Sequence, residues 1–382
     1  MSDRFTPQDG LDADSDPAEE SATGLPEPRR TEWLLMRVLC GDLVSTAVPE
    51  SSPQRIGCTS LGRAQLAAAL SQRWPTASVV CNFQDIYPAQ ESGRLQAHVS
   101  NLSITCVADF PCDPAAPFDL FAFPLQATGD AEWSRELLQS GHQGLAIGGR
   151  MCVSTDNPGD TWFDGELRKL FSKVTARRFP DGIVYSAVKS KPLKKVKSFG
   201  CEFAFRDGER LIRVLSGPGV FSHRHLDLGA RALIEAMTVR PGDRVLDLGC
   251  GAGVVSLAAA MRAENVHVLA IDSNPRAVEC TRASAVLNQL TNVQVLHNAD
   301  AQCDAPGTYD LVLGNPPYFS RHRISEIFLR GAEVALKSGG QVLIVTKDAA
   351  WYREVLPERF DMVSVEERRG YAIVRGRQRS RH

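Results

Sequence analysis

Short apolar runs alternate with segments of helical periodicity from Asp243 to the end of the chain. The apolar runs occupy residues 244–253, which end in a glycine-rich turn, and then 266–272, 293–300, 309–318 and 341–346. Helical patterns lie at 254–263, 275–290 and 324–337, a Gly339-Gly340 turn follows, and segments 360–367 and 371–376 resemble a final hairpin. This alternation predicts an α/β fold, in which helices cover both faces of a doubly wound, seven-stranded sheet.

The first half of the chain repeats this pattern in a more divergent form. "RIGCTSLGRAQLAAAL" (55–70) matches "RVLDLGCGAGVVSLAAA" (244–260), and "FDLFAFPLQ" (118–126) matches "YDLVLGNPP" (309–317). Asp119 and Asp310 are 191 residues apart, and the same offset separates Gly148-Gly149 from Gly339-Gly340. The chain is therefore interpreted as an internal duplication, with two tandem Rossmann-like domains.

Length and composition agree with two globular domains. The chain has 382 residues, 43% of them hydrophobic and 23% charged, which suits a water-soluble protein of more than one core. We expect no membrane span, since no run of about 18 apolar residues occurs, and a cytoplasmic location, since the N-terminus does not resemble a signal peptide. None of the ten cysteines falls in a CxxC pair, so we expect no metal site.

Charge is unevenly distributed along the chain. Residues 1–30 hold eight acids and three arginines and carry −5, which leaves +3 for the remainder of a chain whose net charge is −2. We expect this acidic, Pro-rich opening to be a disordered tail. Basic residues gather in "KSKPLKKVK" (189–197) and in six arginines near the C-terminus, which are Arg368, Arg369, Arg375, Arg377, Arg379 and Arg381. Either group could contact phosphate, or both could simply be solvated.

Polar residues and glycines follow the predicted strands of the second half. Ligands of open α/β folds bind at the carboxyl ends of strands. Gly249, Gly251 and Gly253 would let the backbone approach a ligand beside a helix N-terminus. Asp272 could accept both hydroxyls of a ribose, and Asp300 could bind an adenine amine. The fourth strand ends in "NPPY" (315–318).

This combination resembles the class I S-adenosylmethionine (SAM)-dependent methyltransferases that methylate planar amino groups. The resemblance implies that the side-chain oxygen of Asn315 and the carbonyl of Pro316 each accept a hydrogen bond from the target NH2. Pro316 and Pro317 restrict the backbone so that these acceptors converge, and the ring of Tyr318 stacks on the planar substrate. No general base is implied, because the nitrogen becomes acidic only after it gains the methyl group. The implied cofactor contacts are Phe221, Asp247, Gly249, Cys250, Gly251, Gly253, Asp272, Ser273, Asp300, Ala301 and Asn315.

The motif leaves three substrates open: the N6 amine of adenine, the N2 amine of guanine, and the N5 amide of a release-factor glutamine. The duplication favours guanine, because a degenerate methyltransferase fold ahead of an active one resembles the guanine-N2 methyltransferases of ribosomal RNA. This family includes a type C that modifies small-subunit RNA and a type G that modifies large-subunit RNA. The resemblance extends over residues 31–380 and includes "LSGPGVFSHRHLDLGARALIEAM" (215–237), where Phe221, Ser222, Asp227 and Gly229 match the family pattern. Tyr318 departs from it, since the family usually has phenylalanine there.

The first copy lacks the residues that the chemistry needs. Cys58, Ser60 and Ala64 stand where the second copy has Asp247, Gly249 and Gly253; Phe83 replaces Asp272, and Pro124-Leu125 replace Asn315-Pro316. We therefore expect an acidic tail (1–30), a degenerate domain that binds RNA or is structural (31–188), a basic linker (189–200) and a catalytic domain (201–382). The expected partner is ribosomal RNA or a ribosomal subunit, met by a monomer. The alternative outside enzymology is an RNA-binding ribosome-assembly factor with a vestigial methyltransferase fold.

Overall fold

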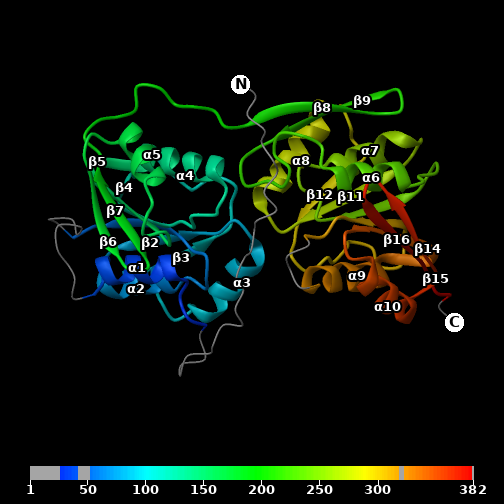
Figure 1. The fold of residues 1–382 in the computed structure, drawn as a ribbon, viewed down its shortest axis with the longest axis horizontal. Coiled ribbons are helices and arrows are strands. Elements are labelled where there is room, and N and C mark those ends of the chain that lie inside the picture. The colour runs from blue at the N-terminus through cyan, green and yellow to red at the C-terminus, as the bar shows by residue number, and fades with distance from the viewer. Residues whose placement is uncertain (1–25, 42–51, 318–321, 381–382) are drawn as a thin grey trace. The chain divides into compact units, whose positions relative to one another are not determined.

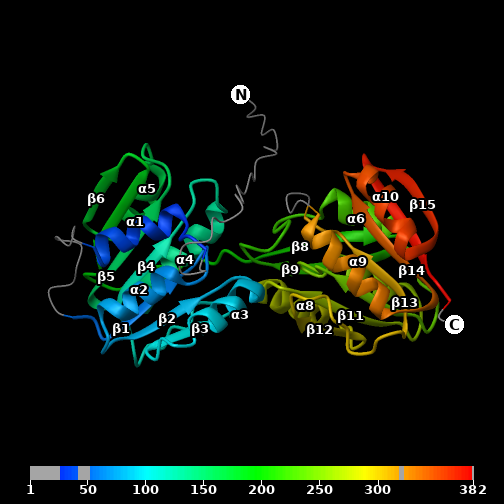
Figure 2. The same ribbon diagram turned by 90° about the horizontal axis from the view of Figure 1, so that it is seen from below.

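The computed structural model describes residues 26–41, 52–317 and 322–380. Tyr318, Arg381 and residues 1–25 of the expected acidic tail lie outside the described residues. The chain divides into two compact units. The first comprises residues up to Val196, except that Phe83–Gln90 and Cys106–Pro111 group with the second, which otherwise begins at Lys197. Each unit has a seven-stranded sheet of its own (Figures 1 and 2).

The first sheet has the strand order β3-β2-β1-β4-β5-β7-β6. Its strands are β1 (Arg55–Thr59), β2 (Ser78–Asn82), β3 (Leu102–Thr105), β4 (Phe118–Pro124), β5 (Leu145–Thr155), β6 (Val174–Phe179) and β7 (Gly182–Val188). The helices in this part of the chain are α1 (Arg30–Leu39), α2 (Gln65–Arg73), α3 (Ile86–Leu95), α4 (Ala131–Gly144) and α5 (Trp162–Leu170). All strand pairs are parallel except those of β7, which runs antiparallel to both of its neighbours.

The second sheet has the equivalent order, β12-β11-β10-β13-β14-β16-β15. Its strands are β10 (Arg244–Leu248), β11 (His267–Asp272), β12 (Val293–His297), β13 (Tyr309–Gly314), β14 (Leu336–Thr346), β15 (Phe360–Arg368) and β16 (Tyr371–Gln378). The helices are α6 (Leu228–Ala236), α7 (Val254–Arg262), α8 (Pro275–Leu287), α9 (Arg323–Ala335) and α10 (Ala349–Arg359). Since the two sheets share one strand order, with one antiparallel strand at the same place, the predicted duplication of a Rossmann-like fold is confirmed.

Successive side chains of the central strands enter separate cores on the two faces of the second sheet. In β13, Leu311 and Leu313 belong to one core and Val312 to the other. The first core is covered by α6, α7 and α8 and the second by α9 and α10, as Figure 1 shows for α6 and α7 on one side and α9 and α10 on the other. A strand buried on both faces needs apolar residues at consecutive positions. This explains why the strands were visible as continuous apolar runs.

Two details of the second unit differ from the sequence prediction. The predicted Gly339-Gly340 turn lies inside β14, where Gly339 has a φ of 75° and the register with β13 shifts between Tyr309 and Leu311. β14 begins at Leu336, which already pairs with Tyr309, so the two glycines form an irregularity within the strand. α9 therefore ends at Ala335 and not near residue 337 as predicted. A hairpin of β8 (Cys201–Asp207) and β9 (Arg210–Ser216) was not predicted at all. Its inner side chains Phe205, Ile212 and Val214 complete the core on the α8 side.

None of the helices in the described part of the chain is long and apolar enough to cross a membrane. Within the same residues, no group of three or more His, Cys, Asp or Glu side chains is arranged to hold a metal ion.

Candidate active site

The loop between β10 and α7 contains glycines for two different reasons. Gly249, Gly251 and Gly253 have φ angles of 70°, 56° and 86°, a region that side chains other than glycine occupy at a cost. At Gly253 an added Cβ would also lie 2.9 Å from the side chain of Thr281, so the packing of α8 excludes a larger residue. At Gly251 the space around a Cβ position is open. The main chain at Gly251 is therefore accessible from the cavity described below.

Asp272, the last residue of β11, holds this loop in place. One carboxylate oxygen accepts the N–H of Gly251 at 2.8 Å and the other accepts the N–H of Asn274 at 2.9 Å. Burial raises the pKa of Asp272, whereas these two N–H donors lower it. Each carboxylate oxygen keeps a further lone pair, so both can still accept a hydroxyl group from a ligand.

Asp247 in β10 is a second carboxylate behind the loop. Its side chain is only 2% exposed and accepts a hydrogen bond from the hydroxyl of Ser256. Burial, assisted by the nearby charge of Asp272, raises the pKa of Asp247 to about 7. The group therefore changes charge near neutral pH, and a cation bound next to it would favour the ionised form.

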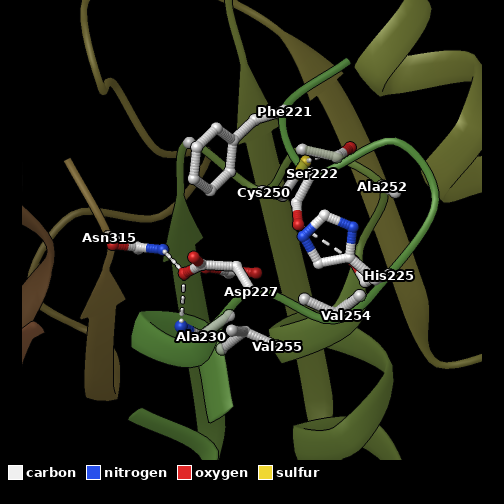
Figure 3. A pocket seen from close by; sticks show the side chains of 13 residues that line it. Phe221, Ser222, His225, Asp227, Ala230, Cys250, Ala252, Val254, Val255 and Asn315 are labelled. Atoms are coloured by element: carbon white, nitrogen blue, oxygen red, sulfur yellow. Dashed lines mark hydrogen bonds between the residues drawn. The ribbon is translucent and has the colours of Figure 1, made fainter. Parts of the chain in front are cut away.

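Asn315 lies beside the glycine loop because of strand pairing. β10 and β13 run parallel, with Leu248 opposite Gly314, so Gly249 and Asn315 leave the sheet at the same edge. The side-chain NH2 of Asn315 donates to Asp227 Oδ2 at 3.1 Å. Asp227 is the residue that caps the N-terminus of α6. Figure 3 shows the amide nitrogen facing this carboxylate.

These groups line one cavity at the carboxyl ends of β10 and β13. Its described lining contains the carboxylates of Asp227 and Asp247 and no lysine or arginine, so it suits a ligand that carries positive charge. The ring of Phe221 is 65% exposed although it lines the cavity. The lining residues are Phe221, Ser222, His225, Asp227, Ala230, Asp247, Gly249, Cys250, Gly251, Ala252, Val254, Val255 and Asn315 (Figure 3).

The structure brings only part of the predicted site to this cavity. The predicted residues in its lining are Phe221, Asp247, Gly249, Cys250, Gly251 and Asn315. Gly253 and Asp272 support the loop from outside the lining, and the carbonyl of Ser273 accepts a hydrogen bond from His297 at 3.0 Å. Asp300 is exposed, whereas Ala301 is buried.

The remainder of the NPPY motif follows Asn315 directly. Pro316 is buried and Pro317 is half-buried, while Tyr318 lies outside the described residues. The stacking role expected of Tyr318 therefore stays a prediction.

Part of the lining was not among the predicted site residues, although Ser222 and Asp227 lie in the segment that matches the family pattern. Most of this part comes from the segment before α6 and from the start of α7. The residues concerned are Ser222, His225, Asp227, Ala230, Ala252, Val254 and Val255. Asp227 carried a usable signal, because an aspartate directly before a helical pattern is typical of an N-cap. Its approach to Asn315, 88 residues away in the sequence, had no such signal.

The two basic clusters differ in how many of their side chains are engaged with other groups of the protein. Lys189 is 7% exposed and its ammonium group donates to the carbonyls of Gln143 and Leu145, at 3.1 and 2.6 Å, so it belongs to the first unit's structure. Lys191, Lys194 and Lys195 are exposed. Near the C-terminus, the described arginines have partners that are distant in sequence or on the same hairpin: Glu366 for Arg368 and Arg375, Glu235 for Arg369, Asp361 for Arg379 and the carbonyl of Gly339 for Arg377.

Comparison with known proteins shows that the second half of the chain is similar to a family of methyltransferases. The family model of the methyltransferase small domain matches residues 211–375. Ribosomal RNA small subunit methyltransferase C of Salmonella paratyphi B is 31% identical over 183 residues, which is 47% of this chain and 52% of that protein. The enzyme of the same name from Escherichia coli K12 gives the same identity and coverage. The chain thus aligns with about half the length of the curated relatives it matches.

Among solved structures, a 16S rRNA N2 methyltransferase of T. thermophilus, in complex with AdoMet and guanosine, has a TM-score of 0.73. The match covers 86% of this chain and 89% of that one at 20% sequence identity, so it shows a shared fold over both tandem domains. Residues 211–375 thus match the model of the methyltransferase small domain, and about half of the chain is similar to the ribosomal RNA small subunit methyltransferases C.

Proposed function

We propose that the chain transfers a methyl group from SAM to the exocyclic N2 amine of a guanine in ribosomal RNA. The observation that carries the proposal is a single cavity that joins a glycine loop of the methyltransferase type to an asparagine amide at the next strand end. The named relatives act on ribosomal RNA, and the T. thermophilus structure contains AdoMet and guanosine. Both facts support the same choice of substrate.

The described residues fit SAM as a cofactor. SAM carries a sulfonium and an ammonium group, and the cavity offers Asp227 and Asp247 with no lysine or arginine in its described lining. The free lone pairs of Asp272 would accept the ribose hydroxyls. When bound, SAM supplies a methyl group that an amine nitrogen can attack, because the sulfur then leaves as a neutral thioether.

The chain's own residues would prepare the amine for that attack. The side-chain oxygen of Asn315 and the carbonyl of Pro316 would accept the two N–H bonds of guanine N2. These bonds localise on nitrogen the lone pair that is otherwise delocalised into the base, and they direct it toward the cavity. The methylated nitrogen then loses its extra proton to solvent, so no side chain needs to act as a base. To reach this site, the guanine would have to leave its stack.

The proposal assigns the parts of the chain as follows. Residues 201–382 catalyse, residues 31–188 hold RNA and residues 189–200 link them. One chain contains both the cofactor loop and Asn315, so a monomer would be sufficient, and its size in solution tests this. An enzyme that acts on ribosomal RNA would be expected to work in the cytoplasm.

The deciding experiment incubates the protein with radiolabelled SAM and either deproteinised ribosomal RNA or assembled subunits, and then identifies the labelled nucleoside. We expect label in N2-methylguanosine. Label on the N6 of adenine, or on glutamine of a release factor offered in parallel, would replace the substrate. A chain that gives no heat on calorimetric titration with SAM would instead be an RNA-binding assembly factor.

A further inference from the structure

Asp227 connects the start of α6 to the end of β13. Its Oδ2 accepts the N–H of Ala230 at 2.8 Å, which caps the helix, and the same oxygen accepts the side-chain NH2 of Asn315 at 3.1 Å. Figure 3 shows both bonds converging on this carboxylate. The helix cap accounts for only the first of them.

The second bond determines which way the amide of Asn315 faces. A primary amide has a donor end and an acceptor end of almost the same shape, so its orientation depends on its hydrogen-bond partners. An ionised carboxylate only accepts, and it therefore selects the NH2 end of Asn315. The amide oxygen must then face away from Asp227.

We infer that Asp227 is a positioning residue for methyl transfer, which orients the amide of Asn315 so that its oxygen, and not its NH2, is the end presented to the substrate amine. The inference rests on the proposed function, since it requires that Asn315 binds an amine. With the amide reversed, the NH2 of Asn315 would oppose the NH2 of the substrate, and neither group can accept. A hydrogen bond to a charged acceptor is also stronger than one to a neutral acceptor. It polarises the amide and makes its oxygen a better acceptor.

Three substitutions separate this role from helix capping. Asp227→Ser keeps a good N-cap residue, but its hydroxyl is carried directly on Cβ and is too short to maintain both bonds. Asp227→Asn keeps the length and an oxygen that can accept from Ala230 and Asn315, without the charge. Asp227→Ala removes both functions. Asp130, which caps α4 through the N–H groups of Glu132 and Trp133, offers the matched control Asp130→Ser.

The assay measures kcat at saturating SAM and RNA together with the melting temperature. We expect Asp227→Ser and Asp227→Ala to lose about 10- to 100-fold in kcat, the size of effect that misplacing a reacting group causes, and Asp227→Asn to lie between them and the wild type. Only Asp227→Ala should melt clearly lower, and Asp130→Ser should keep its kcat. If kcat followed melting temperature instead, so that Asp227→Ser turned over like the wild type, the residue would only cap the helix.

A double variant distinguishes failure of this inference from failure of the proposed function. If Asp227 acts through Asn315, then Asp227→Ser should cause no further loss of kcat in the Asn315→Ala background. A further tenfold loss there would overturn the positioning role while leaving the proposed function intact. An Asn315→Ala protein with full activity would remove the role proposed for Asn315, and with it this inference. The proposed function itself would be removed if the wild-type protein formed no N2-methylguanosine, whatever the Asp227 variants do.

Discussion

At the scale of single residues, three aspartates and one asparagine amide lie at the cavity or its glycine loop, and the aspartates differ in burial and in hydrogen-bond partners. Asp247 is almost fully buried, Asp272 is bound by two main-chain N–H groups, and Asp227 is paired with Asn315. Burial raises the pKa of Asp247 to about 7, and it also raises the pKa of Asp272, which its two N–H donors lower. The three acids are therefore expected to respond differently to substitution.

We expect Asn315→Ala to reduce kcat by about a hundredfold while the dissociation constant for SAM changes little. The loss of one of two acceptors that polarise the amine should add about 3 kcal/mol to the barrier, whereas the proposed cofactor contacts are mainly those of the glycine loop and Asp272. Single-turnover kinetics and calorimetry measure the two quantities. Half of the wild-type rate in this variant would contradict the mechanism.

Asp247 should make the unfolding free energy depend on pH. Its pKa is about 7 in the folded chain against an ordinary value of 3.8, so the folded state binds an extra proton between these values. Stability from this group is complete below about pH 4 and is lost as the pH rises through 7, by an amount of the order of a few kcal/mol.

Urea unfolding between pH 5 and 8 checks this, with Asp247→Asn as the comparison. The asparagine keeps an acceptor for Ser256 and does not titrate. The unfolding free energy of the wild type should therefore fall relative to that of Asp247→Asn as the pH rises. A constant difference across this range would show that Asp247 is already ionised in the folded protein at pH 5.

At the scale of elements, the two copies of the strand–loop–helix unit differ most in the loop. Ala64 retains the left-handed conformation of its counterpart Gly253, with a φ of 60°. In the first unit, a side chain of the protein itself occupies the space at the loop before Ala64. The carboxylate of Glu32 in α1 is fully buried and accepts the hydroxyl of Ser60 at 2.6 Å, and an added Cβ at Gly62 would lie 2.7 Å from its other oxygen. Burial raises the pKa of Glu32, although hydrogen bonds from Ser60 and from main-chain N–H groups lower it.

We therefore predict one SAM site per chain. In the first unit the loop N–H groups already have partners within the chain, namely the Ser60 hydroxyl for Gly62 and Ala64 and the side-chain oxygen of Gln65 for Arg63. In the second unit the space at Gly251 is open. Calorimetric titration of the full chain should give a stoichiometry of one, and Asp272→Ala should abolish the heat. Two sites per chain, or heat that survives in Asp272→Ala, would mean that the first unit binds the cofactor.

At the scale of the whole molecule, binding of ribosomal RNA would require basic side chains that can meet its phosphates. The described C-terminal arginines are engaged with acids or a carbonyl, so they offer less to phosphate than their sequence suggests. The segment after β7 is different, because Lys191, Lys194 and Lys195 are exposed. The proposal that residues 31–188 hold RNA therefore depends more on this linker than on the C-terminus.

We expect replacement of Lys191, Lys194, Lys195 and Lys197 by Ala to weaken RNA binding regardless of sequence. Each lost phosphate contact should reduce the slope of log K against log salt by up to about 0.9 for a duplex, and by less for single strands. Filter binding over a range of salt concentrations measures the slope. Exposed Arg330 and Arg353, replaced by Ala together, are a control that should leave it unchanged, and an unaltered slope in the lysine variant would make the linker passive.

Local patterns along the chain were sufficient for the succession of strands and helices in the second unit, the duplication and the glycine loop, because apolar runs, turn residues and N-caps act over a few positions. The β8–β9 hairpin was missed because its buried positions alternate with exposed ones over only seven residues a strand, and its core partners lie on α7, α8 and the sheet. The pairing of Asp227 with Asn315, the burial that moves the pKa of Asp247 and the Glu32 carboxylate in the first loop were decided only by tertiary structure. Each depends on which segments are adjacent in space, and burial and hydrogen-bond partners are properties of that arrangement rather than of sequence spacing.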